Sequence, residues 1–201
     1  MAEAVLAKRA ERRAREHAGT RRGILDAART LATREGARNL SLRGVAAEAG
    51  YAPAALYGYF RNRGELILAL AADDLSVLSR EMRDAARSCE GAAGFGAAAR
   101  AALAHLLVAE ALAAVPPALD TSSETGEAER LFNGRLIGAL NTLSDAAGGI
   151  AANRDGQCDV VLVAAALTGL AVLSRSGRLS ALGFSADELL ARMESQFSTR
   201  R

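Results

Sequence analysis

Hydrophobic residues recur along most of the chain at intervals of three and four positions, the spacing of one face of an α-helix. Three prolines, no tryptophan and few runs of β-branched residues argue against a sheet. We therefore expect an all-α protein. The predicted helices cover residues 20–36, 41–50, 53–60, 65–87, 95–115, 127–147, 158–176 and 186–198.

Residues 40–66 contain two short predicted helices joined by a tight turn. Ser41 is a favourable N-cap for the first helix, because its hydroxyl can accept from backbone N–H groups that have no helical partner. Gly50 ends that helix and supplies a left-handed turn residue. Pro53 starts the second helix, where its missing N–H is not needed, and Leu56 packs it back onto the first. This pattern predicts a helix-turn-helix, whose second helix enters the major groove of DNA.

The second helix and the turn after it resemble the signature of the TetR family of bacterial transcriptional repressors. The matching sequence is Leu56-Tyr57-Gly58-Tyr59-Phe60, then Arg61-Asn62-Arg63, then Glu65-Leu66-Ile67. The resemblance covers roughly a quarter of the chain, from about Arg22 to Leu70. A helical hairpin in some other all-α domain is the alternative, which the tyrosines and the basic turn disfavour.

The resemblance implies three regions in the chain: a basic flexible arm over residues 1–19, a three-helix helix-turn-helix domain over residues 20–64, and a helical effector-binding and dimerisation domain over residues 65–201. The arm could lie along the minor groove or the phosphate backbone of DNA, or it could be a solvated tail without a role.

The same resemblance implies which residues touch DNA. It implies that Tyr57 and Arg63 contact phosphates and that Ser41 contacts the DNA backbone. The residues implied to contact base edges or the groove are Arg43, Pro53, Ala54, Ala55 and Tyr59. Two positions depart from the family pattern, because Ala52 lacks the usual polar cap and Gly58 lacks a side chain that could reach bases. Arg43 is then the one long donor directed at the groove, with guanine as its natural partner and a phosphate contact as the alternative.

Charge is distributed unevenly along the chain. Residues 1–63 carry 13 Lys/Arg and 6 Asp/Glu, a net charge of +7, whereas residues 64–201 carry 12 and 17, a net charge of −5. A polyanion bound at the N-terminal end, with an acidic body away from it, explains this difference. The alternative is an uneven surface charge without a function. It is disfavoured because the basic region coincides with the helix-turn-helix.

The segment from Val160 to Leu173 is apolar around its whole circumference and contains small residues that allow another helix to approach closely. We predict a two-fold four-helix bundle between two copies of the chain; a wholly intramolecular core is the alternative. A two-fold dimer also suits a palindromic operator in double-stranded DNA, because two recognition helices then read successive major grooves. The predicted interface residues are Ala164, Ala165, Thr168, Gly169, Val172, Leu189, Met193 and Phe197.

The sequence contains no nucleophile elbow, P-loop, zinc-ligand spacing or dinucleotide fingerprint. We therefore expect no catalytic residue, no metal and no cofactor. If the C-terminal domain encloses a cavity, its polar wall residues are His105, Glu110, Asn133 and Asn141. These would suit a largely apolar small-molecule effector of unknown identity, oriented by one or two hydrogen bonds. A satisfied core histidine is the alternative for His105.

The first twenty residues carry charges throughout and lack the apolar segment of a secretory signal. The longest uncharged run, Val160 to Ser174, has fifteen residues, whereas a membrane span needs roughly 20. Cys89 and Cys158 have no metal-type spacing, which fits a reducing compartment. We expect a cytoplasmic protein without a membrane partner.

The function that these patterns favour is a sequence-specific DNA-binding transcriptional regulator, most simply a repressor that a small effector releases from its operator. Two alternatives stay open: a DNA-binding or architectural protein without an effector, and a helical enzyme or carrier that merely contains such a hairpin.

Overall fold

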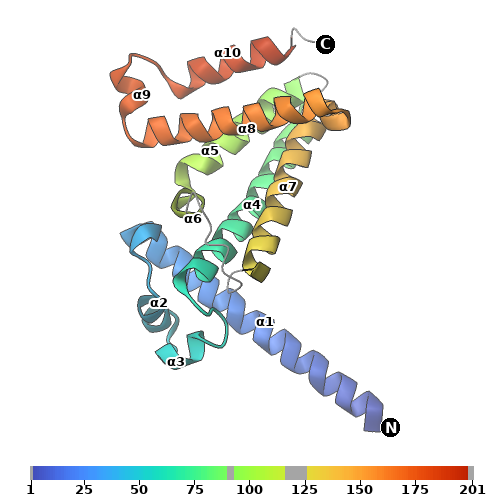
Figure 1. Ribbon diagram of the computed structural model, residues 1–201, viewed down its shortest axis with the longest axis vertical. Coiled ribbons are helices and arrows are strands. Elements are labelled where there is room, and N and C mark those ends of the chain that lie inside the picture. The colour runs from blue at the N-terminus through green and yellow to red at the C-terminus, as the bar shows by residue number, and fades with distance from the viewer. Residues whose placement is uncertain (1, 90–92, 116–125, 199–201) are drawn as a thin grey trace. The chain divides into compact units, whose positions relative to one another are not determined.

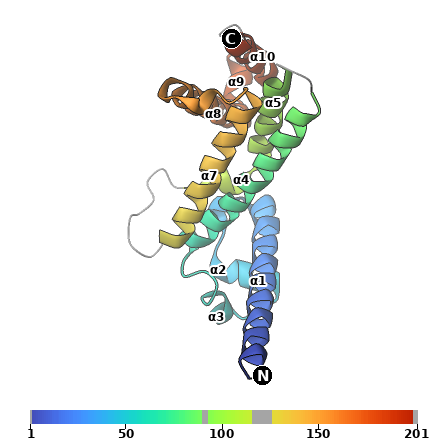
Figure 2. The ribbon, with the colours of Figure 1, turned by 90° about the vertical axis from the view of Figure 1, so that its right-hand side faces the viewer.

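The computed structural model describes residues 2–89, 93–115 and 126–198, and every regular element within these ranges is helical (Figures 1 and 2). The all-α prediction is therefore confirmed. The elements are α1 (Ala2–Glu35), η1 (Ala37–Asn39), α2 (Leu42–Ala49), α3 (Pro53–Leu56), α4 (Arg63–Arg87), α5 (Ala93–Val108), α6 (Glu110–Ala114), α7 (Gly126–Ala146), η2 (Ile150–Ala152), α8 (Arg154–Arg175), α9 (Arg178–Ala181) and α10 (Ala186–Ser198).

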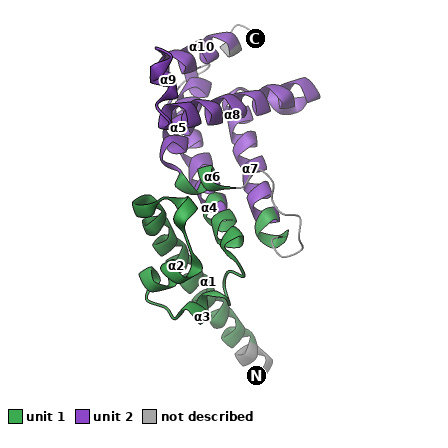
Figure 3. Ribbon diagram, turned by 60° about the vertical axis from the view of Figure 1, so that its left-hand side comes forward, with its two compact units in different colours: residues 1–71, 110–129 green, residues 72–109, 130–201 purple. Residues whose placement is uncertain are grey.

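The chain divides into two compact units (Figure 3). Unit 1 contains residues 1–71 and 110–129, and unit 2 contains residues 72–109 and 130–201. The division falls within α4, whereas the sequence placed a domain boundary between residues 64 and 65. Unit 1 also takes in α6, which packs against η1 and α1.

Unit 1 is built on the apolar stripe of α1, which packs against α2 and η1. Ile24, Ala28 and Leu31 are buried along this stripe, as the helical periodicity predicted. Leu40 and Val45 are buried as well, so the first turn of the helix-turn-helix shares the same core.

The start of α1 differs from the prediction. The apolar pattern placed the first helix start at Thr20, but the helix begins at Ala2. Apolar periodicity reports burial, and the side chains of residues 7–19 are exposed. The helical conformation of this segment is favoured instead by its Ala, Arg and Glu residues, which are strong helix formers. Exposed ion pairs one turn apart also favour it, such as Arg12 with Glu16 at 3.5 Å. Whether this segment is a flexible arm stays a prediction.

Unit 2 has α5 packed across α8, with α10 against both (Figure 1). Alanines dominate the contact face of α5, and Val163 and Leu167 of α8 are buried. The predicted helix over residues 95–115 is in fact two helices, α5 and α6, and its predicted end at Pro116-Pro117 lies outside the described residues. The sequence predicted no break here. The break arises because α6 is placed by contacts with η1 and α1, which no local pattern encodes.

The last helix begins at a capping box. The Ser185 hydroxyl accepts from the N–H of Glu188 at 3.2 Å, and the backbone N–H and hydroxyl of Ser185 donate to the Glu188 carboxylate at 2.8 and 2.7 Å. These two donors hold the pKa of Glu188 below its ordinary value. Ser185 is thus the N-cap of α10.

Candidate DNA-binding site and ligand cavity

The turn between α2 and α3 has the geometry that the sequence predicted. The hydroxyl of Ser41 accepts from the Gly44 N–H at 3.1 Å, which caps α2. Gly50 ends α2 in the left-handed region, with φ of 73°, a conformation that strains any residue with a Cβ. Pro53 occupies the first turn of α3, and Ala52 before it makes no side-chain cap.

Two fully buried side chains hold α3 in place. Leu56 and Phe60 are both 0% exposed, and the Phe60 N–H donates to the Leu56 carbonyl at 2.9 Å. With these residues turned inward, the other side of the motif faces outward. The exposed residues among those predicted to touch DNA are Ser41, Arg43, Pro53, Ala54, Ala55 and Tyr57.

Tyr59 is only half-buried and contacts α1. Its ring stacks on the ring of His17, with centroids 4.5 Å apart. Next to it, the guanidinium carbon of Arg21 lies 5.0 Å from the centroid of the Phe60 ring. The middle of α1 is therefore attached to the recognition segment through ring contacts between residues about forty positions apart, which sequence reasoning missed.

Arg63, which the sequence assigned to a phosphate contact, makes hydrogen bonds within the chain. Its guanidinium donates to the carbonyl oxygens of Leu40 at 2.9 Å, Arg38 at 2.7 Å and Ala37 at 3.5 Å. These bonds fasten the first residue of α4 to η1 and to Leu40, which follows it. The side chain that was assigned to a phosphate is thus engaged with its own backbone, and we call this arrangement the Arg63 clasp.

Arg43 remains available for DNA, because it is exposed on α2 and has no hydrogen bond or ion pair with any described residue. By contrast, Arg34 of α1 is paired with Glu48 of α2 at 3.0 Å and with Glu35 at 3.1 Å. The hydrogen bonds that its guanidinium donates to the carboxylates of Glu48 and Glu35 raise the pKa of Arg34 above its ordinary value. Tyr51, 41% exposed beside the turn, is a further candidate that sequence reasoning did not select.

Three of the four residues predicted to line an effector pocket, His105, Asn133 and Asn141, belong to unit 2, and the fourth, Glu110, belongs to unit 1. His105 of α5 is 10% exposed and its Nδ1 lies 2.9 Å from a carboxylate oxygen of Glu81. Asn133 and Asn141 are exposed on α7, and Glu110 belongs to α6 of unit 1. None of them lines the cavity found within unit 2. Sequence reasoning missed that cavity because its walls come from two helices far apart in the chain.

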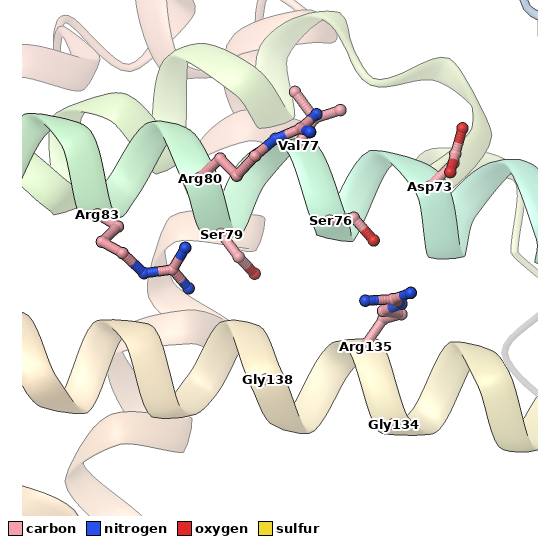
Figure 4. Close-up of a pocket in the computed structure, with 9 residues that line it drawn as sticks. All are labelled: Asp73, Ser76, Val77, Ser79, Arg80, Arg83, Gly134, Arg135 and Gly138. Atoms are coloured by element: carbon pink, nitrogen blue, oxygen red, sulfur yellow. The ribbon is translucent and has the colours of Figure 1, made fainter.

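The cavity in unit 2 lies between α4 and α7 and has a volume of about 480 Å³ (Figure 4). Ser76, Ser79 and Arg83 point from α4 toward α7, and Arg135 points from α7 toward α4. The complete lining is Asp73, Ser76, Val77, Ser79, Arg80, Arg83, Gly134, Arg135 and Gly138.

Two glycines of α7 form one wall of this cavity, one helical turn apart. A Cβ on Gly134 or Gly138 would meet nothing within 4 Å, so neither glycine is required by close packing. A glycine inside a helix costs about 1 kcal/mol relative to alanine. Their effect here is to leave the space in front of α7 open.

Helix α8 exposes apolar side chains on the face opposite its contact with α5. Val161, Leu162 and Val172 are 53%, 63% and 55% exposed. Among the predicted interface residues, Ala165 and Thr168 are exposed, and Ala164, Gly169 and Leu189 are half-buried. Met193 is 9% exposed, so it belongs mainly to the core of unit 2, and the side chain of Phe197 lies outside the described residues.

By length and composition, α8 is also the one described helix that could cross a membrane, with 28% of its most apolar window buried. Core and interface helices of water-soluble proteins have the same composition. Within the described ranges, no group of three His, Cys, Asp or Glu side chains could hold a metal ion.

The N-terminal unit of this all-α chain presents a helix-turn-helix, the motif that places a recognition helix in the major groove in one class of DNA-binding regulators. Residues 24–70 match the family model of the bacterial regulatory proteins of the tetR family. These residues thus resemble the N-terminal region of that family, and the chain has the fold of TetR-type transcriptional regulators.

Solved structures of the same fold cover nearly the whole chain. A protein of unknown function from Rhodococcus sp. RHA1 is 29% identical, with a TM-score of 0.64 over 89% of this chain and 93% of that one. A TetR transcriptional regulator from the same organism is 23% identical, with a TM-score of 0.61 over 92% and 99%. The regulator FadR of Bacillus subtilis, solved in complex with stearoyl-CoA, is 17% identical, with a TM-score of 0.61 over 87% and 96%. No curated protein sequence matches the chain.

Proposed function

We propose that this protein is a cytoplasmic, homodimeric repressor that occupies a palindromic operator and is released by a small-molecule effector. The observation that carries the proposal is the α2–Gly50–α3 motif, in which buried Leu56 and Phe60 lie behind an exposed face that bears Arg43 and Tyr57. The net charge of +7 over residues 1–63 supports a polyanionic partner at this face.

An effector is supported by two observations. The fold is shared with a regulator that was solved in complex with an organic ligand, stearoyl-CoA. Helix α4 carries the Arg63 clasp at its first residue and lines the cavity of unit 2 further along, at Ser76 to Arg83. A ligand that shifts α4 would therefore alter the support of the segment before α2.

The experiment that tests the proposal is selection of bound DNA from a random pool with the full-length protein. We expect a palindromic consensus with one strongly required guanine in each half-site. Ala54 and Ala55 offer only apolar contact, which favours thymine methyl groups at the flanking positions. A pool that yields no consensus would contradict sequence-specific binding and favour an architectural protein.

Arg43→Ala is expected to weaken binding to the selected operator by about 1–3 kcal/mol, because a bidentate contact to guanine is lost. The loss should shrink on an operator in which that guanine is replaced. Titration of both proteins against both DNAs by fluorescence anisotropy measures the difference. Equal losses on both DNAs would instead assign Arg43 to a phosphate, and specificity would then come mainly from DNA shape.

The homodimer is supported by the exposed apolar face of α8, because burying these apolar side chains against a second copy removes them from water and lowers the free energy. Gly169→Arg tests it, because a Cβ at this position meets nothing within 4 Å and the single chain can accommodate the change. We expect the variant to sediment as a monomer or to become insoluble, and the matched variant Gly169→Ala to remain a dimer. A wild-type protein that is monomeric at micromolar concentration rules out this interface.

A further inference from the structure

The cavity between α4 and α7 is lined mainly by polar and charged groups. Three arginines and two serines line it, with Asp73 as its one carboxylate. We propose that this cavity binds a small organic anion carrying a phosphate or carboxylate group, and that this anion is the effector. The second part rests on the proposed function, since an effector requires a DNA-binding regulator to act on.

The positive charge of the cavity has little compensation. Arg83 and Arg135 extend toward the gap from opposite walls (Figure 4). Arg135 has no hydrogen bond or ion pair with any part of the chain that the structure describes, and within the same part Arg83 donates a single hydrogen bond, to the Thr142 hydroxyl at 3.4 Å. Like charges on facing helices repel each other, and a bound anion between them removes that repulsion.

This positive cluster stands out against its surroundings, because residues 64–201 carry a net charge of −5. The guanidinium group is planar and presents two parallel N–H donors, which match the paired oxygens of a carboxylate or phosphate. Two guanidinium groups on opposite walls can therefore hold one anionic group from both sides.

The serines of α4 supply further polar contacts. The hydroxyls of Ser76 and Ser79 now donate to the carbonyls of Ala72 at 2.9 Å and Leu75 at 2.8 Å. A serine hydroxyl can rotate about its C–O bond, so each proton can be redirected to an oxygen atom in the cavity. Four donors from two helices then surround the same space.

The size of the cavity indicates an organic ligand. At about 480 Å³ it lies in the range of small-molecule sites and exceeds the size of one inorganic ion. Gly134 and Gly138 keep this volume open, because any larger side chain on that face of α7 would occupy it.

Titration calorimetry of the full-length protein without DNA tests binding, with inorganic pyrophosphate and citrate as probes at constant ionic strength. We expect one probe or both to bind at one site per chain. Binding of pyrophosphate alone assigns a phosphorylated ligand, and binding of citrate alone assigns a carboxylate. Failure of both probes to bind overturns the proposal.

Variants locate the site. Arg135→Gln and Arg83→Gln should each raise Kd about tenfold, as expected for the loss of one charged hydrogen-bonding partner. Gly138→Leu should abolish binding by filling the cavity, and Gly138→Ala, which fills less of it, shows whether the helix tolerates substitution. Arg192→Gln removes an exposed arginine of α10 that does not line the cavity. An equal loss in Arg192→Gln would mean that general charge, and not this cavity, attracts the probe.

The effector role is tested separately by operator binding with and without the probe that binds, at matched ionic strength. We expect the probe to lower operator affinity of the wild type at least tenfold more than that of Arg135→Gln. If the probe binds but operator affinity does not change, the effector role is overturned and the anion site remains. If the protein never binds a specific operator, the proposed function fails while the calorimetry still decides the anion site.

Discussion

Gly156→Ala is expected to lower the free energy of unfolding of unit 2 by about 3 kcal/mol, a large fraction of the stability of a domain. Gly156 is buried in the first turn of α8, where η2 passes directly over it. A Cβ at this position would overlap the carbonyl oxygen of Ile150 and lie 2.6 Å from its carbonyl carbon. Both are backbone atoms, so the overlap is relieved only by displacing η2 or by unwinding the start of α8.

The start of α8 has little freedom to adjust. The Gly156 N–H donates to the Asn153 side chain at 2.9 Å, which caps the helix. The Ala151 N–H donates to the Ser144 hydroxyl at 3.0 Å, which ties η2 to the end of α7. Moving either segment therefore breaks a hydrogen bond as well as the packing.

Urea denaturation followed by circular dichroism measures the effect. The matched control is Gly134→Ala, which also places a methyl group on a helical glycine but meets nothing within 4 Å. The control is expected to leave stability unchanged or to raise it by up to about 1 kcal/mol, because alanine is the better helix former. Equal stability of Gly156→Ala and the wild type would show that η2 does not lie against α8.

Arg63→Ala is expected to destabilise unit 1 by about 2–3 kcal/mol, because the Arg63 clasp satisfies three backbone carbonyls at once. The segment from Ala37 to Leu40 would lose its attachment to α4, and α2 follows that segment directly. DNA affinity should then fall for all sequences alike, as the support of the recognition motif loosens.

Arg63→Lys separates the clasp from a phosphate contact. Lysine keeps the positive charge, so a phosphate contact would largely survive, but one ammonium group cannot reproduce the fork of donors that reaches three carbonyls. We expect Arg63→Lys to lose most of the stability that Arg63→Ala loses, measured by thermal denaturation. Arg43→Ala is the control, since it should weaken DNA binding without changing stability. A stable Arg63→Lys variant with normal DNA binding would show that Arg63 acts through its charge, as a phosphate contact, and not through the clasp.

The sequence determined the features that depend on neighbours in the chain. The hydroxyl of Ser41, the positive φ of Gly50 and the first-turn position of Pro53 act on backbone groups only a few residues away. The capping box of Ser185 and Glu188 is equally local. The helical spacing of apolar residues likewise identified α2, α4, α7 and α10 and the buried face of α1. These features sufficed for the helix-turn-helix and its resemblance to the TetR family.

Only the tertiary structure decided which distant residues meet. His17 stacks on Tyr59, and Arg63 binds carbonyls more than twenty positions earlier. The cavity between α4 and α7 joins residues about sixty positions apart, and no local pattern distinguishes its arginines from other surface arginines. The reason is physical: caps and periodicity are set by the chain's own short-range geometry, whereas a clasp or a cavity exists only after two helices have packed, and packing depends on the whole of both faces.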